Sequence, residues 1–237
     1  MNLLLLKPEQ INNSVAMVSG RQLDQLIQVQ GCVPGDSVRV GELNGLIGSA
    51  IVTELNDQRA VLELNLDSAA PPPLPLTLLL AMPRPKMLRR TLQTVASMGV
   101  KQIYLINSFR VEKSFWQSPF LQPEAIEEQL ILGLEQARDT QLPELHIRKR
   151  FKPFVEDELA AIIAGTEALL AHPITDSPCP IDLQKPATLA IGPEGGFIPY
   201  EVEQLCAAGF EAVHIGPRIL RVETAVPALI ARLFPGQ

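Results

Sequence analysis

Two loops in the last third of the sequence share a motif suited to holding a ligand. The triplet Ile-Gly-Pro occurs at Ile191–Pro193, where Glu194–Gly196 follow, and again at Ile215–Pro217, where Arg218 follows. Glycine lets a ligand approach the backbone closely and leaves N–H and C=O groups available as hydrogen-bond partners. A site built mainly of backbone suits an adenine ring and a zwitterionic amino acid. The alternative is that glycine and proline simply end two strands.

A candidate catalytic pair follows the second loop. Arg221 and Glu223 lie close together in the sequence. Arginine can stabilise an anion without losing its own proton, and a carboxylate can orient or accept a proton. The alternative is an ion pair at the start of a helix, where Glu223 would be favourable because of the helix dipole alone.

Three predicted strands would position these loops. Leu169–Ala171 run into His172-Pro173, and the two Ile-Gly-Pro triplets close the strands at 187–191 and 212–215. Ligands of open parallel sheets bind beyond the carboxyl ends of the strands. Ile191 and Ile215 are 24 residues apart, which fits one strand–helix–strand unit. We therefore expect the two loops to be neighbours on one edge of a sheet.

A proline-rich linker at 71–75 separates two patterns of sequence. Residues 1–70 contain short alternating runs broken by turn signals, which predict a small antiparallel β-barrel with one helix near 20–28. In residues 76–237, strands alternate with helices, which predicts an α/β domain whose parallel sheet is covered on both faces. The expected strands are 76–82, 102–106, 145–149, 168–171, 187–191 and 212–215, and the expected helices are 86–98, 123–138, 155–164, 199–208 and 223–233.

Basic residues gather around the first helix of the second domain. They are Arg84, Lys86, Arg89 and Arg90, at the end of a strand or in the helix's first turns. This placement predicts a phosphate-binding patch, and the alternative for Arg89 and Arg90 is a solvated helix face. The net charge of −6 excludes a uniformly basic surface but permits a local patch.

Composition and missing motifs exclude several classes of protein. Hydrophobic residues make up 46% of the chain, which excludes intrinsic disorder. The scattered Cys32, Cys179 and Cys206 form no C-x-x-C pair, so we expect reduced thiols and no metal site. The sequence also lacks a dinucleotide-binding fingerprint and a P-loop. No apolar run is long enough for a signal core or a membrane span, so we expect a soluble cytoplasmic protein.

The two glycine loops also carry a resemblance to a known family. Residues Ile191–Phe197 and Ile215–Ala225 resemble the bacterial small-subunit (16S) ribosomal RNA uracil-N3 methyltransferases, which belong to the SPOUT class. Leu169–Pro173 are similar to the family's strand ending in His-Pro, and Glu135-Gln136 with Arg138 to its Glu-Gln-x-x-Arg helix. Residues 1–70 resemble its PUA-type barrel.

The resemblance implies a fold, a cofactor and a substrate. The fold is a SPOUT-type parallel sheet with a C-terminal trefoil knot, preceded by a PUA-like RNA-binding barrel, in a homodimer. The cofactor is S-adenosylmethionine, and the substrate is N3 of a uridine in ribosomal RNA of the small subunit, with Arg138 among the RNA-binding residues. The positions that match the cofactor site are Leu170, His172, Pro173, Ile191, Gly192, Pro193, Glu194, Gly195, Gly196, Ile215, Gly216, Arg218, Ile219, Leu220, Thr224 and Ala225.

Several positions depart from the family pattern. Gln28 stands in a stretch where an arginine is usual, and Ala96–Met98 replace part of Glu-Leu-Gly-Val. Ile198 replaces a helix-capping serine, and Pro227 falls within the last predicted helix, which it should kink or delay. Two alternatives therefore stay open: a cofactor-binding paralogue that acts on another RNA, and a non-catalytic RNA-binding dimer.

Overall fold

The computed structural model describes residues 2–236 and divides the chain within the predicted proline linker. Unit 1 comprises the described residues up to Pro72 together with Leu130–Leu142, and unit 2 comprises Pro73–Gln129 and the described residues from Pro143 onwards. The segment Leu130–Leu142 was expected in the second domain, whereas the structure includes it in unit 1.

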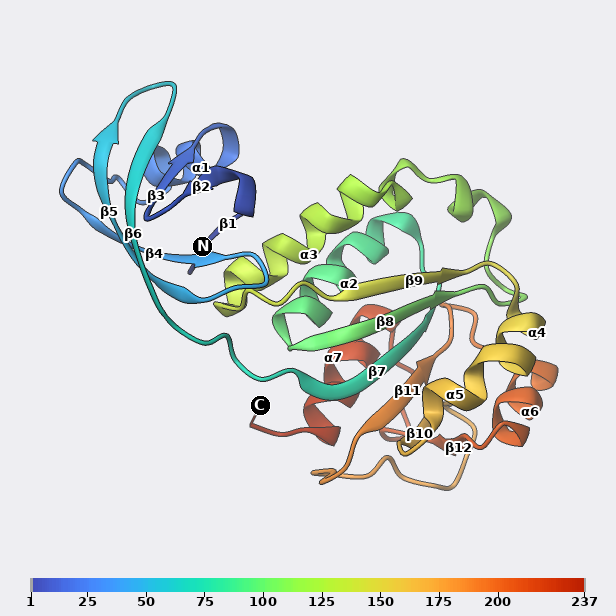
Figure 1. Ribbon diagram of the computed structural model, residues 1–237. Coiled ribbons are helices and arrows are strands. Elements are labelled where there is room, and N and C mark those ends of the chain that lie inside the picture. The colour runs from blue at the N-terminus through green and yellow to red at the C-terminus, as the bar shows by residue number, and fades with distance from the viewer. Residues whose placement is uncertain (1, 237) are drawn as a thin grey trace. The chain divides into compact units, whose positions relative to one another are not determined.

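Unit 1 is built around a curled six-stranded sheet with the order β1-β4-β5-β6-β3-β2 (Figure 1). Buried and exposed residues alternate along its strands, so that Val40, Val52 and Leu62 pack on one face in an apolar core. Its elements are β1 (Leu4–Leu6), η1 (Pro8–Gln10), β2 (Ile11–Asn12), β3 (Val15–Val18), α1 (Gly20–Asp24), η2 (Gln25–Val29), β4 (Ser37–Glu42), β5 (Ile47–Leu55) and β6 (Ala60–Ser68).

The pairing of β1 with β4 is parallel, whereas the other pairings of this sheet are antiparallel. The expectation of a wholly antiparallel sheet was therefore wrong for this one pair. The physical reason is that β1 and β4 are not joined by a hairpin. Five elements (η1, β2, β3, α1 and η2) lie between them in the chain, so no tight turn forces them to run in opposite directions.

Glu135 explains why a distant segment belongs to unit 1. Its side chain is fully buried and accepts hydrogen bonds from Arg21 Nη1 at 2.9 Å and Nη2 at 3.0 Å. The Leu5 backbone N–H also points to this carboxylate, at 3.4 Å. A buried carboxylate needs such partners, because burial without them is costly. The helix that carries Glu135, α3 (Pro123–Ala137), begins in unit 2 and ends in unit 1.

Unit 2 contains a six-stranded sheet with the order β12-β10-β11-β7-β8-β9, and each neighbouring pair in it is parallel. The predicted parallel sheet is confirmed. The elements are β7 (Leu74–Ala81), α2 (Pro85–Ser97), β8 (Val100–Ile106), η3 (Lys113–Gln117), η4 (Pro119–Leu121), β9 (Glu144–Arg148), α4 (Phe151–Pro153), η5 (Phe154–Glu158), α5 (Leu159–Ile163), β10 (Glu167–Ala171), β11 (Ala187–Ile191), α6 (Pro199–Ala207), β12 (Glu211–Val213) and α7 (Val222–Leu233).

Helices cover both faces of this sheet (Figure 1). Leu79 and Ala81 of β7 point to the face covered by η5, α5 and α6, where Phe154 and Leu205 complete an apolar core. On α2, the predicted stripe of Leu88, Leu92 and Val95 is buried. This helix packs against α7 and β8.

Two helix ends and one proline show how local sequence sets the boundaries in unit 2. Gly99 and Gly209 adopt positive φ angles of 80° and 114° just beyond α2 and α6, as we predicted for helix-ending glycines. Pro227 lies inside α7, which begins at Val222, so the helix is not delayed by it. At α6, Pro199 occupies the first turn, and the Ile198 N–H donates to Glu201 at 3.0 Å, while Ile198 itself supplies no side-chain cap.

Candidate functional site

Three strand ends meet at one edge of the unit 2 sheet. Ala171 of β10 is in register with Ile191 of β11 on one side and with Val213 of β12 on the other. The two Ile-Gly-Pro loops therefore lie at the same edge, as expected. They are not on adjacent strands, because β10 lies between β11 and β12 and brings His172 between the loops.

A cavity of about 620 Å³ opens beyond these strand ends. It is lined by fourteen of the sixteen predicted cofactor positions: His172, Pro173, Ile191, Gly192, Pro193, Glu194, Gly195, Gly196, Ile215, Gly216, Arg218, Ile219, Leu220 and Ala225. The other two lie elsewhere. Leu170 is buried in the apolar core on the α5 and α6 face, and Thr224 is exposed on α7.

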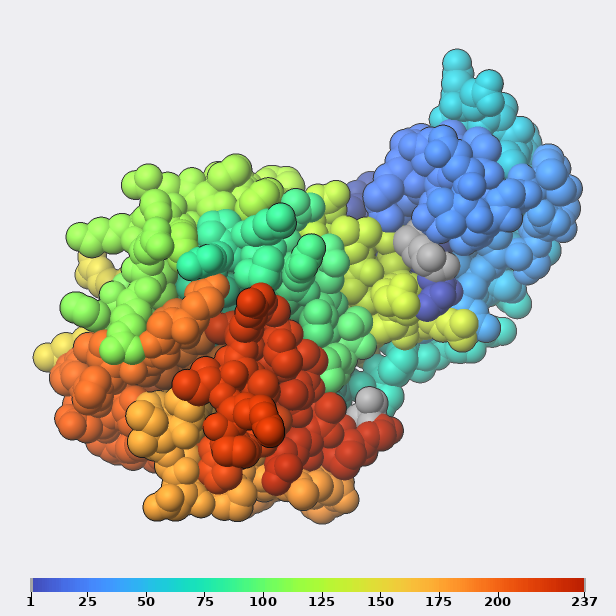
Figure 2. Space-filling model, turned by 180° about the vertical axis from the view of Figure 1, so that it is seen from behind, coloured from blue at the N-terminus to red at the C-terminus, as the bar shows by residue number. Residues whose placement is uncertain are grey.

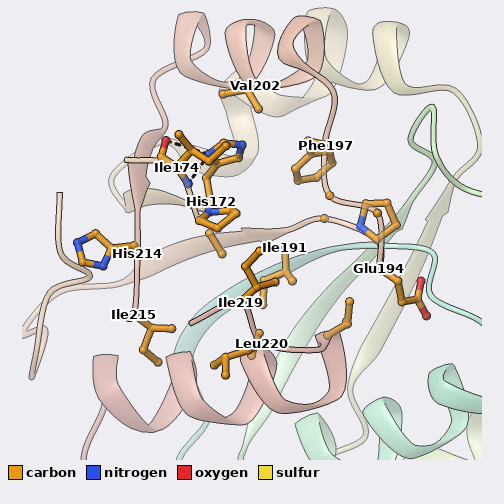
Figure 3. Close-up of a pocket in the computed structure, with 18 of the residues that line it drawn as sticks. His172, Ile174, Ile191, Glu194, Phe197, Val202, His214, Ile215, Ile219 and Leu220 are labelled. Carbon is orange, nitrogen blue, oxygen red and sulfur yellow. Dashed lines mark hydrogen bonds between the residues drawn. The ribbon is translucent and has the colours of Figure 1, made fainter. Parts of the chain in front are cut away.

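The walls of the cavity are largely apolar. Figure 3 shows Ile191, Ile219 and Leu220 grouped in the centre of the view, with Phe197 and Val202 above them. Ile219 is 83% exposed and Ile174, at another side of the cavity, is 84% exposed. Apolar walls with a few placed polar groups are typical of small-molecule sites.

The three glycines of the first loop are favoured for different reasons. A Cβ at Gly192 would lie 3.0 Å from the backbone nitrogen of Phe197, and a Cβ at Gly195 would lie 3.0 Å from Cδ of Arg110. Gly196 instead adopts a φ of 73°, which favours glycine whatever the space around it. The first two therefore permit close packing within the protein, where the sequence suggested close approach of a ligand.

Glu194 contacts the backbone of another element. Its Oε1 accepts a hydrogen bond from the backbone N–H of Arg84 at 3.1 Å. Arg84 is the N-cap residue of α2, where a negative charge is favourable because of the helix dipole. In Figure 3 the carboxylate of Glu194 points away from Ile191 and Ile219. Glu194 therefore links the glycine loop to the start of α2.

Sequence reasoning missed several lining residues. On α7, Val222 and Leu229 line the cavity beside the predicted Ala225, and their helical spacing from Ala225 was a signal that would have found them. Arg110 also lines it but gave no signal, because it lies in the segment after β8, far from both loops in the chain. The remaining missed residues are Ala171, Ile174, Phe197, Pro199, Val202, Glu203, Val213 and His214.

The predicted catalytic and RNA-binding residues do not line this cavity. Arg221 is the exposed N-cap residue of α7 and Glu223 lies in its first turn, next to the lining residue Val222. Within the described residues 2–236, Arg221 and Glu223 form no salt bridge with one another. Figure 2 shows α7, in red, at the surface of unit 2.

The predicted RNA-binding residues are exposed in two places. In unit 2 the guanidinium of Arg89 lies 4.9 Å from the centre of the Phe120 ring. Arg138 belongs to unit 1, where it lines a second, open hollow together with Arg39. The other three, in unit 2, are Arg84, Lys86 and Arg90.

Two kinds of feature are absent from residues 2–236. No group of three or more histidine, cysteine or acidic residues is arranged to hold a metal ion. None of the helices is long and apolar enough to cross a membrane.

Comparisons with known proteins connect these observations to one family. Residues 70–234 match the family described as RNA methyltransferase domain. The chain is 30% identical over 240 residues to ribosomal RNA small subunit methyltransferase E of Treponema pallidum, covering 98% of this chain and 90% of that protein. The protein of the same name from Synechocystis is 26% identical, over 97% of this chain and 76% of that protein.

A solved structure resembles the fold over nearly its whole length. It is the ribosomal RNA small subunit methyltransferase E of Neisseria gonorrhoeae bound to S-adenosyl methionine, with a TM-score of 0.74 and 23% identity. The match covers 98% of this chain and 95% of that one.

Proposed function

This chain belongs to the RNA methyltransferase domain family, and we propose that it transfers a methyl group from S-adenosylmethionine to ribosomal RNA of the small subunit. The observation that carries the proposal is the cavity of unit 2, whose walls include fourteen of the predicted cofactor positions. Its volume of about 620 Å³ lies in the usual range for small ligands, roughly 300–1,000 Å³. Relatives named for this activity match nearly the whole chain, which also supports it.

We propose that the cavity holds S-adenosylmethionine between its glycine loops. Both glycine loops line the cavity, and backbone groups of this kind suit the donors and acceptors of an adenine ring and an amino acid. The apolar side chains of Ile191 and Leu220 suit the flat faces of the ring.

N3 of a uridine is the acceptor that we propose. The N3 proton must leave, the sulfonium–methyl bond breaks as the N3–methyl bond forms, and S-adenosylhomocysteine is released. Arg221 stabilises the anionic base, and Glu223 orients or accepts the proton. Both residues flank Val222 at the start of α7, so they lie beside the cavity where RNA is to meet the cofactor.

The proposed fold and assembly follow the same family. We propose a trefoil knot in unit 2, a PUA-type RNA-binding role for unit 1, and a homodimer. The exposure of Ile174 and Ile219 on two sides of the cavity supports coverage of this region by a second copy, because large exposed apolar side chains are common at interaction sites. We place the protein in the cytoplasm, with its proposed substrate.

The first experiment separates cofactor binding from catalysis. Wild-type protein and Arg221→Ala are compared by calorimetry with S-adenosylmethionine and by methyl incorporation into small-subunit RNA. We expect Arg221→Ala to abolish transfer and to change the Kd of the cofactor by less than about tenfold, roughly 1.4 kcal/mol. Wild-type turnover in this variant would refute the catalytic assignment.

Mass spectrometry of ribosomal RNA from a deletion strain should show one methyluridine missing.

One alternative acceptor is favoured by a specific observation. Gln28, in a stretch where the family usually has an arginine, is exposed in η2 and so is available to an RNA. Ala96, by contrast, is fully buried in α2 and changes packing rather than an RNA contact. A paralogue that acts on another RNA would bind S-adenosylmethionine but would not methylate small-subunit RNA from the deletion strain. A non-catalytic RNA-binding dimer would not bind the cofactor.

A further inference from the structure

Arg110 is the charged residue of the cavity that lies farthest along the chain from the glycine loops. Its Nη1 donates a hydrogen bond to the backbone carbonyl of Gly195, 85 residues later. Its aliphatic stem also packs on this glycine, since a Cβ at Gly195 would lie 3.0 Å from Cδ and 3.5 Å from Cβ of Arg110. In Figure 2 the green segment after β8 lies against the orange segment that follows β11.

The segment that carries Arg110 is itself fixed. The carboxylate of Glu201, which is 3% exposed, accepts hydrogen bonds from Phe109 N–H at 2.7 Å and from Ser108 Oγ at 3.2 Å. It also accepts from Ile198 N–H at 3.0 Å, just beyond the glycine loop. This buried carboxylate holds the two segments in one arrangement. If either segment moved away, the carboxylate would lose a donor and its buried negative charge would be left without a partner, which is costly. Arg110 therefore extends from a rigid support.

The peptide between Gly195 and Gly196 needs such a support. Neither residue has a side chain to restrict it, and glycine has more conformational freedom to lose than any other residue. On its other side, Gly196 N–H donates to the Pro193 carbonyl at 2.7 Å. The hydrogen bond from Arg110 to the Gly195 carbonyl completes the restraint of this loop.

We propose that Arg110 is a positioning residue of the cofactor site, which acts by holding the Gly195 carbonyl and so fixes the cavity wall made by Gly195 and Gly196. The inference rests on the proposed function and deepens it. It assigns the pre-organisation of the loop to a charged residue from a separate segment of the chain. Loss of Arg110 leaves the loop to be ordered by the cofactor, which weakens binding.

The test compares Arg110→Ala, Arg110→Lys and the control Arg150→Ala, whose exposed side chain does not line the cavity. Calorimetry measures the Kd of S-adenosylmethionine, and steady-state assays measure KM for each substrate. We expect Arg110→Ala to raise the Kd and the KM of the cofactor about 10- to 100-fold, as for loss of a charge-assisted hydrogen bond. KM for RNA and kcat should stay near wild type, and Arg110→Lys should partly restore cofactor binding.

A second measurement keeps the proposal testable if one variant folds poorly. Gly195→Ala places a Cβ against Arg110 Cδ, so it should weaken cofactor binding strongly in the wild-type background and much less in combination with Arg110→Ala. Additive effects, or a wild-type Kd in Arg110→Ala, would overturn the inference. If the wild-type protein itself fails to bind S-adenosylmethionine, it is the proposed function that fails.

Discussion

At the scale of single residues, the acidic groups around the cavity act mainly on backbone. Glu194 accepts from the Arg84 N–H, and Glu201 accepts from the Phe109 and Ile198 N–H groups. Both carboxylates therefore hold loops against helix starts, where negative charge is favourable. Glu203 of α6 also lines the cavity, and Glu223, in the first turn of α7, remains the acidic residue that we propose for a role with the substrate.

The three thiols should differ sharply in reactivity. Burial raises the pKa of the Cys179 thiol, and nearby Arg232 opposes this only in part, whereas Cys206 is exposed. A raised thiol pKa means less thiolate at a given pH, and the thiolate is the reactive form. We expect a disulfide reagent at pH 8 to modify Cys206 first, then Cys32, and Cys179 only on unfolding.

Mass spectrometry of the labelled peptides against time measures these rates. Raising the pH from 8 to 9 should accelerate labelling of Cys32, whose pKa is raised chiefly by burial and also by Asp36. Labelling of native Cys179 as fast as Cys206 would contradict its burial.

The cavity residues that belong to a continuous sequence motif could be predicted. The loops Gly192–Gly196 and Ile215–Leu220 could be identified from their glycine and proline residues and from the family resemblance. Arg110 did not, because its role depends on a contact between segments that only the sheet order brings together. The reasons for Gly192 and Gly195 were also out of reach, since they depend on neighbours in space.

At the scale of elements, the end of α3 is unusual. Arg138 adopts a φ of 60°, and the next residue, Asp139, donates its N–H to the Leu134 carbonyl at 3.1 Å. This is the helix ending that glycine normally occupies, because a left-handed conformation is costly for other residues. A strained arginine at an exposed position favours a role that glycine cannot serve, such as the phosphate contact we predicted for it.

Arg138→Gly separates that role from stability. Glycine relieves the backbone strain, which stabilises the folded protein, but its greater flexibility also stabilises the unfolded chain. The net effect should raise the free energy of unfolding by up to about 1 kcal/mol. RNA affinity, measured by filter binding, should fall. Gly99→Ala is the matched control, since its φ of 80° should make the substitution cost about 1 kcal/mol. A lower melting temperature for Arg138→Gly would contradict the strain argument.

Element types were predictable because hydrophobic period and turn residues are local. The structure has β11 at the predicted bounds and α2 within one residue of them. Pairing was harder. The hydrophobic period of a strand does not show which strand it pairs with. It therefore could not predict the parallel β1–β4 pair or the place of β10 between β11 and β12. The knot and the PUA-type identity of unit 1 stay predictions of the resemblance.

At the scale of the whole molecule, the net charge of −6 limits how RNA can be held. Attraction must come from local cations, and Arg90 is exposed on α2 without the aromatic contact that Arg89 makes. The logarithm of the RNA association constant should fall linearly with the logarithm of the potassium chloride concentration, with a slope set by the number of phosphate contacts. We expect Arg90→Ala to reduce that slope by about 1, and exposed Lys113→Ala to leave it unchanged. An unchanged slope for Arg90→Ala would exclude a phosphate contact.

The inclusion of Leu130–Leu142 in unit 1 has a consequence for synthesis on the ribosome. The strands of unit 1 are complete by Ser68, but the carboxylate that Arg21 binds arrives only with Glu135. At about 5–20 residues per second, the ribosome needs roughly 4–14 seconds to translate from Pro72 to Leu142. The unit that starts first therefore cannot finish first. During that interval the sheet of unit 1 lacks the end of α3, which is translated within the sequence of unit 2.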